Sequence, residues 1–275
     1  MHPTTVVRSV MGSLEFRNLW GFGLDPCPNL IVMTDAPGLR YWFHLRDKLI
    51  GQEIAHNTYE LKVTALVRRL IKPGMAVLDI GANLGYYSVL MGAHGCTVHA
   101  FEPFPGNFAL LTRNIAENRL TTVTAHQIAA HSETKTGKLF FRDDDQNENY
   151  GSMFTSGNSQ PRHLSSVDVC YAQLDGYLSS AGGFGFAKID AEGAEIHVLR
   201  GMSGILKRDR PILVLELNEE ALLTASGHTP EQLLAALGEL GYRVFDVETG
   251  EPYTLPATRQ TYVVADLLCR PEENH

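Results

Sequence analysis

The sequence predicts a doubly wound α/β fold, with a mostly parallel sheet, an antiparallel edge strand and a small N-terminal β-rich appendage. From Met75 onward, short apolar runs alternate with stretches whose apolar residues recur at helical spacing. The runs are nearly continuous, as in parallel strands that helices cover on both faces. The last two runs, residues 243–246 and 261–266, enclose a turn-forming segment, which predicts a closing hairpin and the antiparallel edge.

The first part of the chain differs from the rest. The segment "NLIVMTDAPGLRYWFHL" holds two β-rich runs around Asp35, Ala36, Pro37 and Gly38, a pattern typical of a hairpin. Apolar residues at helical spacing follow over residues 59–71, and Pro73-Gly74 ends this helix. We therefore divide the chain into a β-rich appendage, residues 1–57, and a main domain, residues 58–275.

The main domain continues as a regular alternation. The expected strands are residues 76–80, 97–101, 123–128, 184–189 and 212–217, and the expected helices are residues 84–93, 105–118, 194–200 and 230–240. Residues 138–142 predict a further strand, and the polar segment that follows, residues 143–163, predicts a long loop. Loops of this length are either disordered or cover a site, and the sequence leaves both open. Gly151 and Ser152 are the candidate residues for such a cover.

Composition limits the class of protein. With 44% hydrophobic and 20% charged residues, the 275-residue chain resembles an ordinary folded globular protein. A net charge of −8 argues against a nucleic-acid partner, because phosphate contacts require clustered lysines and arginines. The four scattered cysteines form no CxxC pair and are expected to be reduced. No apolar stretch approaches the ~18 residues of a membrane span, and the N-terminus lacks a signal-peptide core, so we expect a cytoplasmic protein without a membrane partner.

The turn after the first main-domain strand, in "VLDIGANLGYYS", indicates a ligand site. Counted from Gly81, a dinucleotide fingerprint would need glycines where Asn83 and Tyr86 stand, and Gly85 lacks the Lys-Ser/Thr pair of a Walker A loop. A phosphate is therefore not expected. The turn still brings backbone N–H groups at a helix N-terminus toward a ligand, which favours a carboxylate, and Asn83 tolerates unusual dihedral angles.

A second acid lies where a ribose is held in nucleoside-binding sheets. Glu102 follows the second strand about twenty residues after the turn, and a carboxylate can accept hydrogen bonds from both ribose hydroxyls. A carboxylate site beside a ribose site outlines S-adenosylmethionine, an amino acid joined to adenosine without a phosphate. Asp79 would then lie near its amino group or sulfonium. The alternative is that Asp79 and Gly81 only end a buried strand and that Glu102 only caps the next helix.

Four segments together resemble a known family. They are "VLDIGANLGYYS", "FEPFPGNFALLTRNIAEN", "AKIDAEGAEIHVLRGM" and "PILVLELNEE", which in this order resemble the FkbM family of S-adenosylmethionine-dependent methyltransferases over roughly residues 57–220. The resemblance implies a class I methyltransferase fold and O-methylation of sugars or secondary metabolites. "NTYE", before the first helix of the main domain, resembles a Tyr-Glu pair of the family. This resemblance implies that Tyr59 and Glu60 lie near the amino-acid end of the cofactor.

The candidate cofactor site combines these residues with the end of the third strand. Gln127, Ile128 and Ala129 are expected to bound the adenine. The full set of candidate cofactor-binding residues is Tyr59, Glu60, Asp79, Gly81, Asn83, Gly85, Glu102, Pro103, Gln127 and Ala129.

The candidate catalytic residues lie in "KIDAEGAE". Lys188 and Asp190 share one face of a strand, and Glu192 joins them if the chain stays extended. In a buried parallel sheet such charges belong at the carboxyl end, which faces the ligand crevice. We therefore expect Asp190 to be the general base, with Lys188 and Glu192 tuning its charge or binding the acceptor.

Two alternatives remain for these acids. Asp190 or Glu192 could cap the helix that starts near Ala194, or Asp190, Glu192 and Glu216 could together bind Mg²⁺ in place of a base. We predict no metal in the site.

Two histidines are further candidates. His131, at "IAAH", could reach an acceptor, although a polar loop residue is the favoured interpretation. His197, in a predicted helix, is expected to be structural.

The sequence therefore predicts an S-adenosylmethionine-dependent O-methyltransferase that acts on a hydroxyl group of a small molecule. The alternatives are a carboxylate or peptide methyltransferase that forms a methyl ester, and a non-catalytic cofactor-binding partner protein. The sequence leaves a homodimer open.

Overall fold

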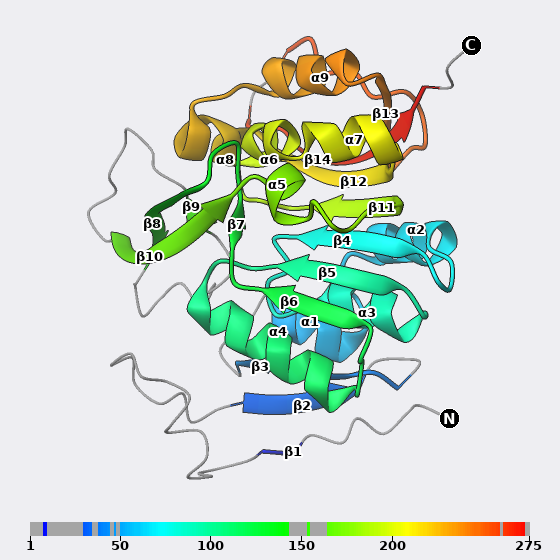
Figure 1. The fold of residues 1–275 in the computed structure, drawn as a ribbon, viewed down its shortest axis with the longest axis vertical. Helices are drawn as coiled ribbons and strands as arrows, with labels where there is room; N and C mark the ends of the chain where they lie inside the picture. The colour runs from blue at the N-terminus through cyan, green and yellow to red at the C-terminus, as the bar shows by residue number, and fades with distance from the viewer. Residues whose placement is uncertain are drawn as a thin grey trace.

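The structure is a computed structural model, and it describes residues 8–9, 30–34, 38–44, 47, 50–142, 153–154, 164–258 and 261–272. Within these residues the main sheet has seven strands in the order β13-β14-β12-β11-β4-β5-β6 (Figure 1). Their bounds are β4 Ala76–Ile80, β5 Thr97–Phe101, β6 Val123–His126, β11 Phe184–Ile189, β12 Ile212–Asn218, β13 Tyr242–Asp246 and β14 Val264–Pro271.

The pairing directions in this sheet confirm the predicted class. Strands β6, β5, β4, β11 and β12 pair in parallel, whereas β14 pairs antiparallel with both β12 and β13. The antiparallel pairing therefore lies at one edge of the sheet, as predicted, and β14 is inserted between β12 and β13.

Helices cover both faces of the main sheet. One face packs against α2 (Leu61–Leu70), α3 (Tyr86–Ala93) and α4 (Pro105–Glu117), and the other against α5 (Leu174–Tyr177), α6 (Glu195–Gly201), α7 (Ser203–Asp209) and α9 (Pro230–Glu239). Val77 of β4 belongs to the first core, and its neighbour Leu78 belongs to the second. This alternation follows from the two-residue period of a strand, and it explains why both positions are apolar.

A smaller sheet projects beside the carboxyl ends of the main strands (Figure 1). Its order is β7-β10-β8-β9, with bounds β7 Ala129–Ala130, β8 Lys135–Arg142, β9 Met153–Phe154 and β10 Leu164–Ala172. The strand predicted at residues 138–142 is confirmed within β8, but β10 was not predicted. Gly151 and Ser152, the candidate cover residues, lie outside the described residues.

The N-terminal hairpin is confirmed. β2 (Leu30–Thr34) and β3 (Arg40–His44) pair antiparallel, and β1 (Arg8–Ser9) adds to β2. The short helix α1 (Ile50–His56) follows, and α8 (Glu219–Ala221) and the π-helical turn η2 (Leu222–Ser226) follow β12. The division at residue 57 remains a prediction.

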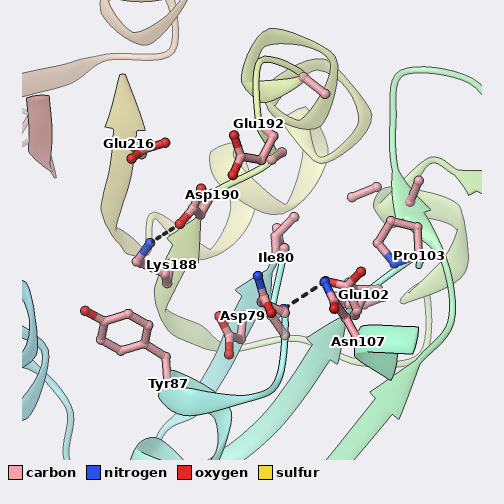
Figure 2. Close-up of a pocket in the computed structure, with 18 of the residues that line it drawn as sticks. Asp79, Ile80, Tyr87, Glu102, Pro103, Asn107, Lys188, Asp190, Glu192 and Glu216 are labelled. Carbon is pink, nitrogen blue, oxygen red and sulfur yellow. Dashed lines mark hydrogen bonds and ion pairs between the residues drawn. The ribbon is translucent and has the colours of Figure 1, made fainter. Parts of the chain in front are cut away.

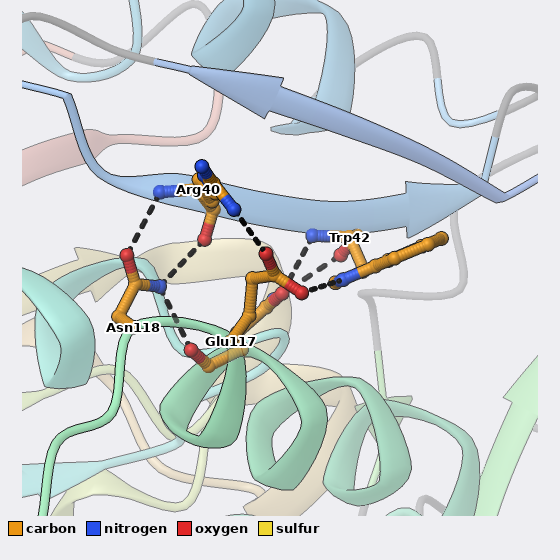
Figure 3. Close-up of polar contacts among 5 residues, drawn as sticks. Arg40, Trp42, Glu117 and Asn118 are labelled. Carbon is orange, nitrogen blue, oxygen red and sulfur yellow. Dashed lines mark hydrogen bonds and ion pairs between the residues drawn. The ribbon is translucent and has the colours of Figure 1, made fainter. Parts of the chain in front are cut away.

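Two asparagines of the α4 region hold β3 against the main domain (Figure 3). The Asn114 amide accepts from Trp42 N at 2.5 Å and donates to Trp42 O at 3.1 Å, and the Asn118 amide does the same for Arg40 at 2.9 and 2.7 Å. Residues four apart on a helix and two apart on a strand have nearly equal spacing, so each asparagine can pair with the backbone as a neighbouring strand would. Trp42 also packs into the first core.

None of the helices in the described part of the chain combines the length and apolar character that a membrane crossing requires.

Candidate active site

A cavity of about 260 Å³ opens at the carboxyl ends of β4, β5, β11 and β12 (Figure 2). This is the edge at which open α/β sheets hold their ligands. The predicted residues that line it are Tyr59, Glu60, Asp79, Gly81, Asn83, Glu102, Pro103, Ala129, Lys188, Asp190 and Glu192. The structure therefore brings together residues from five separate parts of the sequence.

Two predicted residues lie off this cavity. Gly85 is the residue before α3, where its φ of 92° turns the chain into the helix, and it packs on Leu111. Gln127 is exposed in the turn between β6 and β7, while Ile128 beside it faces the cavity. Of the three residues expected at this strand end, Ile128 and Ala129 line the cavity and Gln127 does not.

The turn after β4 has no amide to spare for an anion. Gly81 N and Ala82 N both donate to Phe101 O at 2.9 Å, and Gly85 N donates to Ala82 O at 2.8 Å. The intervening amides donate to side chains: Asn83 N to Glu102 Oε2, and Leu84 N to Asn83 Oδ1. The chain itself thus supplies an acceptor for each amide from Gly81 to Gly85. A carboxylate site at the N-terminus of the helix that follows stays a prediction.

Gly81 is required for close packing as well as for the turn. Its φ is 79°, and a Cβ built there would lie 1.7 Å from the carbonyl oxygen of Asp190. The amide of Asp190 in turn donates to Ile80 O at 2.9 Å. The glycine turn and the Asp190 loop thus form one packed unit at the cavity floor.

Glu102 is held by two backbone amides. Its Oε2 accepts from Asn83 N and its Oε1 from Phe104 N, both at 2.8 Å, and the residue is 4% exposed. Burial raises the pKa of Glu102 to about 7, and the two amides oppose that rise. Each carboxylate oxygen keeps a second lone pair, so the group can still accept from a pair of ligand hydroxyls. Asn107, on the first turn of α4, lies beside it in Figure 2.

A buried aspartate and two aromatic residues form the other end of the cavity. Asp79 is 2% exposed and accepts from Ser88 Oγ at 2.5 Å, and burial raises its pKa to about 6. Tyr87 Oη donates to Glu60 Oε2 at 2.5 Å. Burial and the charge of Glu60 raise the pKa of Tyr59, which keeps its phenol neutral. Glu60 itself has a φ of 40°, a left-handed conformation that costs a non-glycine residue about 1 kcal/mol.

Lys188 and Asp190 form an ion pair at the end of β11. Lys188 Nζ lies 3.0 Å from Asp190 Oδ2, and the two side chains are 3% and 24% exposed. Burial alone would lower the pKa of Lys188, but the charges of Asp190 and Glu60 outweigh it and raise the pKa. Lys188 therefore stays protonated, and it is the only lysine or arginine among the described residues that line the cavity.

Glu192 reaches the cavity by a different route from the predicted one. The chain does not stay extended, because Glu192 has a φ of 49°. The expected strand parity is therefore wrong, although its side chain points into the cavity in Figure 2. Burial and the charges of Asp190 and Glu216 raise its pKa well above the usual value. Glu216 on β12 has a pKa of about 8, for which burial and then the charge of Asp190 are the main causes.

The helix-capping alternative does not hold. α6 starts at Glu195, so its N-cap residue is Ala194, and no side chain at that position caps the helix. Glu195 Oε1 instead braces the loop, because it accepts from Ala191 N at 3.1 Å and Gly193 N at 3.0 Å. In the described residues no three or more His, Cys, Asp or Glu side chains converge as metal ligands would, and this includes the trio of the magnesium alternative.

The two histidines lie side by side. His131 lies in the loop after β7, as favoured, but it is 8% exposed and lines the cavity. Its ring stacks on that of His197 in α6, with 4.2 Å between the ring centroids. Their contact depends on the packing of β7 against α6, which sequence periodicity does not reveal.

Several lining residues were missed. Tyr87, Asn107 and Leu139 face the cavity, and Glu216 was considered only as a metal ligand. Asn107 and Tyr87 lie inside the quoted family segments. The segments therefore indicated that part of the site, but not that these two side chains face the cavity. Leu139 comes from β8, whose position over the cavity no local pattern indicates.

Fold and site together define the class of protein. The fold is the class I methyltransferase fold, a mostly parallel seven-stranded sheet in the described residues with antiparallel pairing at one edge. The model of the family described as "Methyltransferase FkbM domain" matches residues 79–244. The chain therefore belongs to the FkbM methyltransferase family, whose members are generally S-adenosylmethionine-dependent.

Individual relatives align over parts of the chain. It is 37% identical over 78 residues to the 31-O-demethyl-FK506 methyltransferase FkbM of Streptomyces tacrolimicus, covering 27% of this chain and 29% of that protein. It is 27% identical over 152 residues to Methyltransferase 1 of Beauveria bassiana, covering 46% of this chain and 57% of that protein. The chain thus aligns with less than two thirds of either curated relative.

Solved structures show low sequence identity to the chain. The FkbM methyltransferase of Methylobacillus flagellatus KT is 16% identical, with a TM-score of 0.44, and the match covers 81% of this chain and 55% of that one. The precorrin-6y C5,15-methyltransferase of Geobacter metallireducens GS-15 is 13% identical, with a TM-score of 0.47 and coverage of 82% and 92%.

Proposed function

We propose that the chain is an S-adenosylmethionine-dependent O-methyltransferase that acts on an uncharged, hydroxylated small molecule. The observation that carries the proposal is one cavity with two kinds of acid. Glu102 is fixed by two amides and keeps lone pairs for a diol, whereas Asp190 is paired with a buried lysine at the open side.

The residues of the cavity fit the proposed cofactor. Six carboxylates among its described lining residues face one lysine, so the cavity favours a ligand that brings positive charge and hydroxyl donors. Glu102 would hold the ribose hydroxyls, Asp79 and Glu60 the cationic amino-acid end, and Ile128 and Ala129 the flat face of the adenine. The six carboxylates are Glu60, Asp79, Glu102, Asp190, Glu192 and Glu216.

Bound S-adenosylmethionine supplies an electrophilic methyl group on a sulfonium. The chain must then orient the acceptor and take the proton that its hydroxyl loses. Asp190 is placed for this task, because its carboxylate reaches the cavity while Lys188 fixes one of its oxygens at 3.0 Å. Glu216, whose pKa is about 8, keeps a proton near neutral pH and can donate a hydrogen bond to an acceptor oxygen. Burial shifts the pKa of Glu192 in the same direction.

The same charges oppose an anionic acceptor. A carboxylate or phosphate would add negative charge where burial and then the charge of Asp190 already raise the pKa of Glu192 and Glu216. A neutral hydroxylated acceptor meets no such penalty. This supports ether formation over methyl-ester formation.

Cofactor binding is the first test. Calorimetry with S-adenosylmethionine and S-adenosylhomocysteine should show saturable binding of both, and it should be weakened by changes at Glu102. No affinity for either compound would refute the proposal.

Methyl transfer is the second test. Incubation with methyl-labelled cofactor and a panel of neutral polyols, phenols, carboxylic acids and phosphorylated sugars should label a neutral hydroxyl compound. Asp190→Asn should bind the cofactor normally and transfer little label. Labelling confined to carboxylic acids would establish the ester-forming alternative instead.

A further inference from the structure

A second hollow shares His131 with the main cavity. It encloses about 360 Å³ and is bounded by β8, Tyr171 of β10, His197 of α6 and Ser226. The main cavity encloses about 260 Å³, so the second space is also large enough for a ring-sized group. The shared residue places the second hollow next to the main cavity.

A stack of rings forms one wall of the second hollow, and of these rings only that of His131 also lines the main cavity. The ring of His131 lies 4.9 Å from that of Tyr171 at 16° and 4.2 Å from that of His197 at 12°. His228 meets the outer side of His197 edge-on at 5.2 Å. Since both faces of the His131 ring are covered, only its edge is left to contact a ligand.

A glycine in β8 makes room for this stack. A Cβ added at Gly137 would lie 2.5 Å from the ring of Tyr171, whose hydroxyl donates to Lys138 O at 2.8 Å. The Tyr171 ring therefore lies flat over the β8 backbone, and its other face supports His131. The wall is thus fixed by packing before any ligand arrives.

The hydrogen bonds of His131 determine what its edge presents. Its Nδ1 accepts from Glu133 N at 3.2 Å, and burial lowers its pKa. The neutral ring then carries its proton on Nε2, which is a hydrogen-bond donor. Ring edges also carry positive partial charge, so the stack favours electronegative ligand atoms.

The nearby lysines do not turn the hollow into an anion site. Lys135 is paired with Glu133, and Lys138 is paired with Asp168 at 3.2 Å. The charges therefore balance around the rim, while the ring edges still offer donors. A ligand with uncharged oxygens matches this wall better than a phosphate or a hydrocarbon.

We propose that the second hollow binds an uncharged, oxygen-rich part of the acceptor next to the group that is methylated, and that His131 donates its Nε2 hydrogen bond to it. This proposal rests on the proposed function, because it takes the main cavity to hold the cofactor and the reacting hydroxyl. It makes His131 a specificity-determining residue.

Binding, rather than turnover, tests the proposal. The full chain labelled with ¹⁵N-histidine is titrated with methyl β-D-glucopyranoside, with and without S-adenosylhomocysteine, and the ring nitrogen signals are followed. The signals of His131 and His197 should shift saturably. The stacked pair His99 and His126, in the main sheet, should stay unchanged. Methoxycyclohexane, a similar ring without the hydroxyl groups, should cause no shift.

Variants identify the donor. His131→Phe keeps a ring in the stack without the donor and should weaken glucoside binding roughly tenfold, followed at His197. His131→Asn, which restores an N–H donor, should recover part of the loss and also serves if the Phe variant does not fold. Equal shifts with methoxycyclohexane, or none at His131 and His197 with the glucoside, would overturn the proposal. If the glucoside shifts appear while S-adenosylhomocysteine does not bind, the proposed function fails and the subsite stands.

Discussion

The two halves of the cavity differ in how completely the chain pairs their polar and charged groups. Around Gly81 and Glu102, the turn amides and the carboxylate oxygens already have partners within the chain. Around Asp190, Glu192 and Glu216, by contrast, a single lysine faces three acids, and two of these acids have raised pKa values. The first half is preorganised by hydrogen bonds, whereas the second keeps electrostatic strain that a ligand can relieve. In the proposed function, hydrogen bonds thus support cofactor binding in the first half, and electrostatic interactions support the chemistry in the second.

The largest effect is expected in the strained half. Asp190→Asn should lower the methyl-transfer rate by about 100- to 10,000-fold, the usual contribution of a positioned general base. Because the cofactor half is untouched, its affinity for S-adenosylhomocysteine should stay within about twofold of the parent. The measurement is single-turnover transfer of labelled methyl with calorimetry as control. Turnover at the parental rate would remove Asp190 from the mechanism.

The next effect tests the packed half. Gly81→Ala introduces a left-handed alanine and a Cβ 1.7 Å from Asp190 O, and should cost roughly 2–4 kcal/mol of unfolding free energy. Gly74→Ala is the matched control, because its φ is 81° but a Cβ there has nothing within 4 Å. That variant should lose only about 1 kcal/mol in denaturant unfolding. Equal losses would show that the contact with Asp190 contributes little.

The sequence predicted the preorganised half better than the strained half. Gly81, Asn83 and Glu102 follow from a local pattern, because a strand, a tight turn and a helix start fix them within a short segment. A local pattern cannot show, however, that Phe101 O at the end of the adjacent strand β5 accepts from the amides of Gly81 and Ala82. Glu192 was predicted on a false parity, because only the closed loop reveals its positive φ.

Residues contributed by distant elements were the hardest to predict. Leu139 and His131 reach the cavity through the small sheet, whose strand β10 was not predicted. Tertiary packing brings these two residues to the cavity, and the apolar pattern of their own segments does not indicate this position. The fold class, in contrast, follows from repeated apolar runs and was confirmed in full.

A smaller effect is expected at Glu102. Its two oxygens each accept from one amide, and a glutamine can satisfy only one of them. Glu102→Gln should therefore cost about 1–3 kcal/mol of stability and weaken S-adenosylhomocysteine binding by about tenfold or more. Glu195→Gln is the control, because a single oxygen of Glu195 accepts from both its amides and a glutamine can keep that oxygen in place. Calorimetry that gives both variants the parental affinity would exclude the ribose role.

The size of the effect expected at Glu216 depends on pH. The folded pKa of about 8 lies above the unfolded value, so the native state holds a proton that the unfolded state releases as pH rises. The associated stabilisation is present below the unfolded pKa and is lost as pH rises toward 8. Glu216→Gln keeps the neutral form at every pH, and its stability should lie close to that of the parent near pH 5 and exceed it by up to about 4 kcal/mol near pH 8.

Denaturant unfolding at several pH values checks this difference between variant and parent. Other acids with raised pKa values, such as Asp79 and Glu102, are present in both proteins, so their contributions cancel. Glu220→Gln, at an exposed position just beyond β12, should show no such pH-dependent gain. A Glu216→Gln protein less stable than the parent at pH 8 would mean that ionised Glu216 is stabilised by Lys188 and that this half of the cavity is not strained. The contrast between the two halves would then disappear.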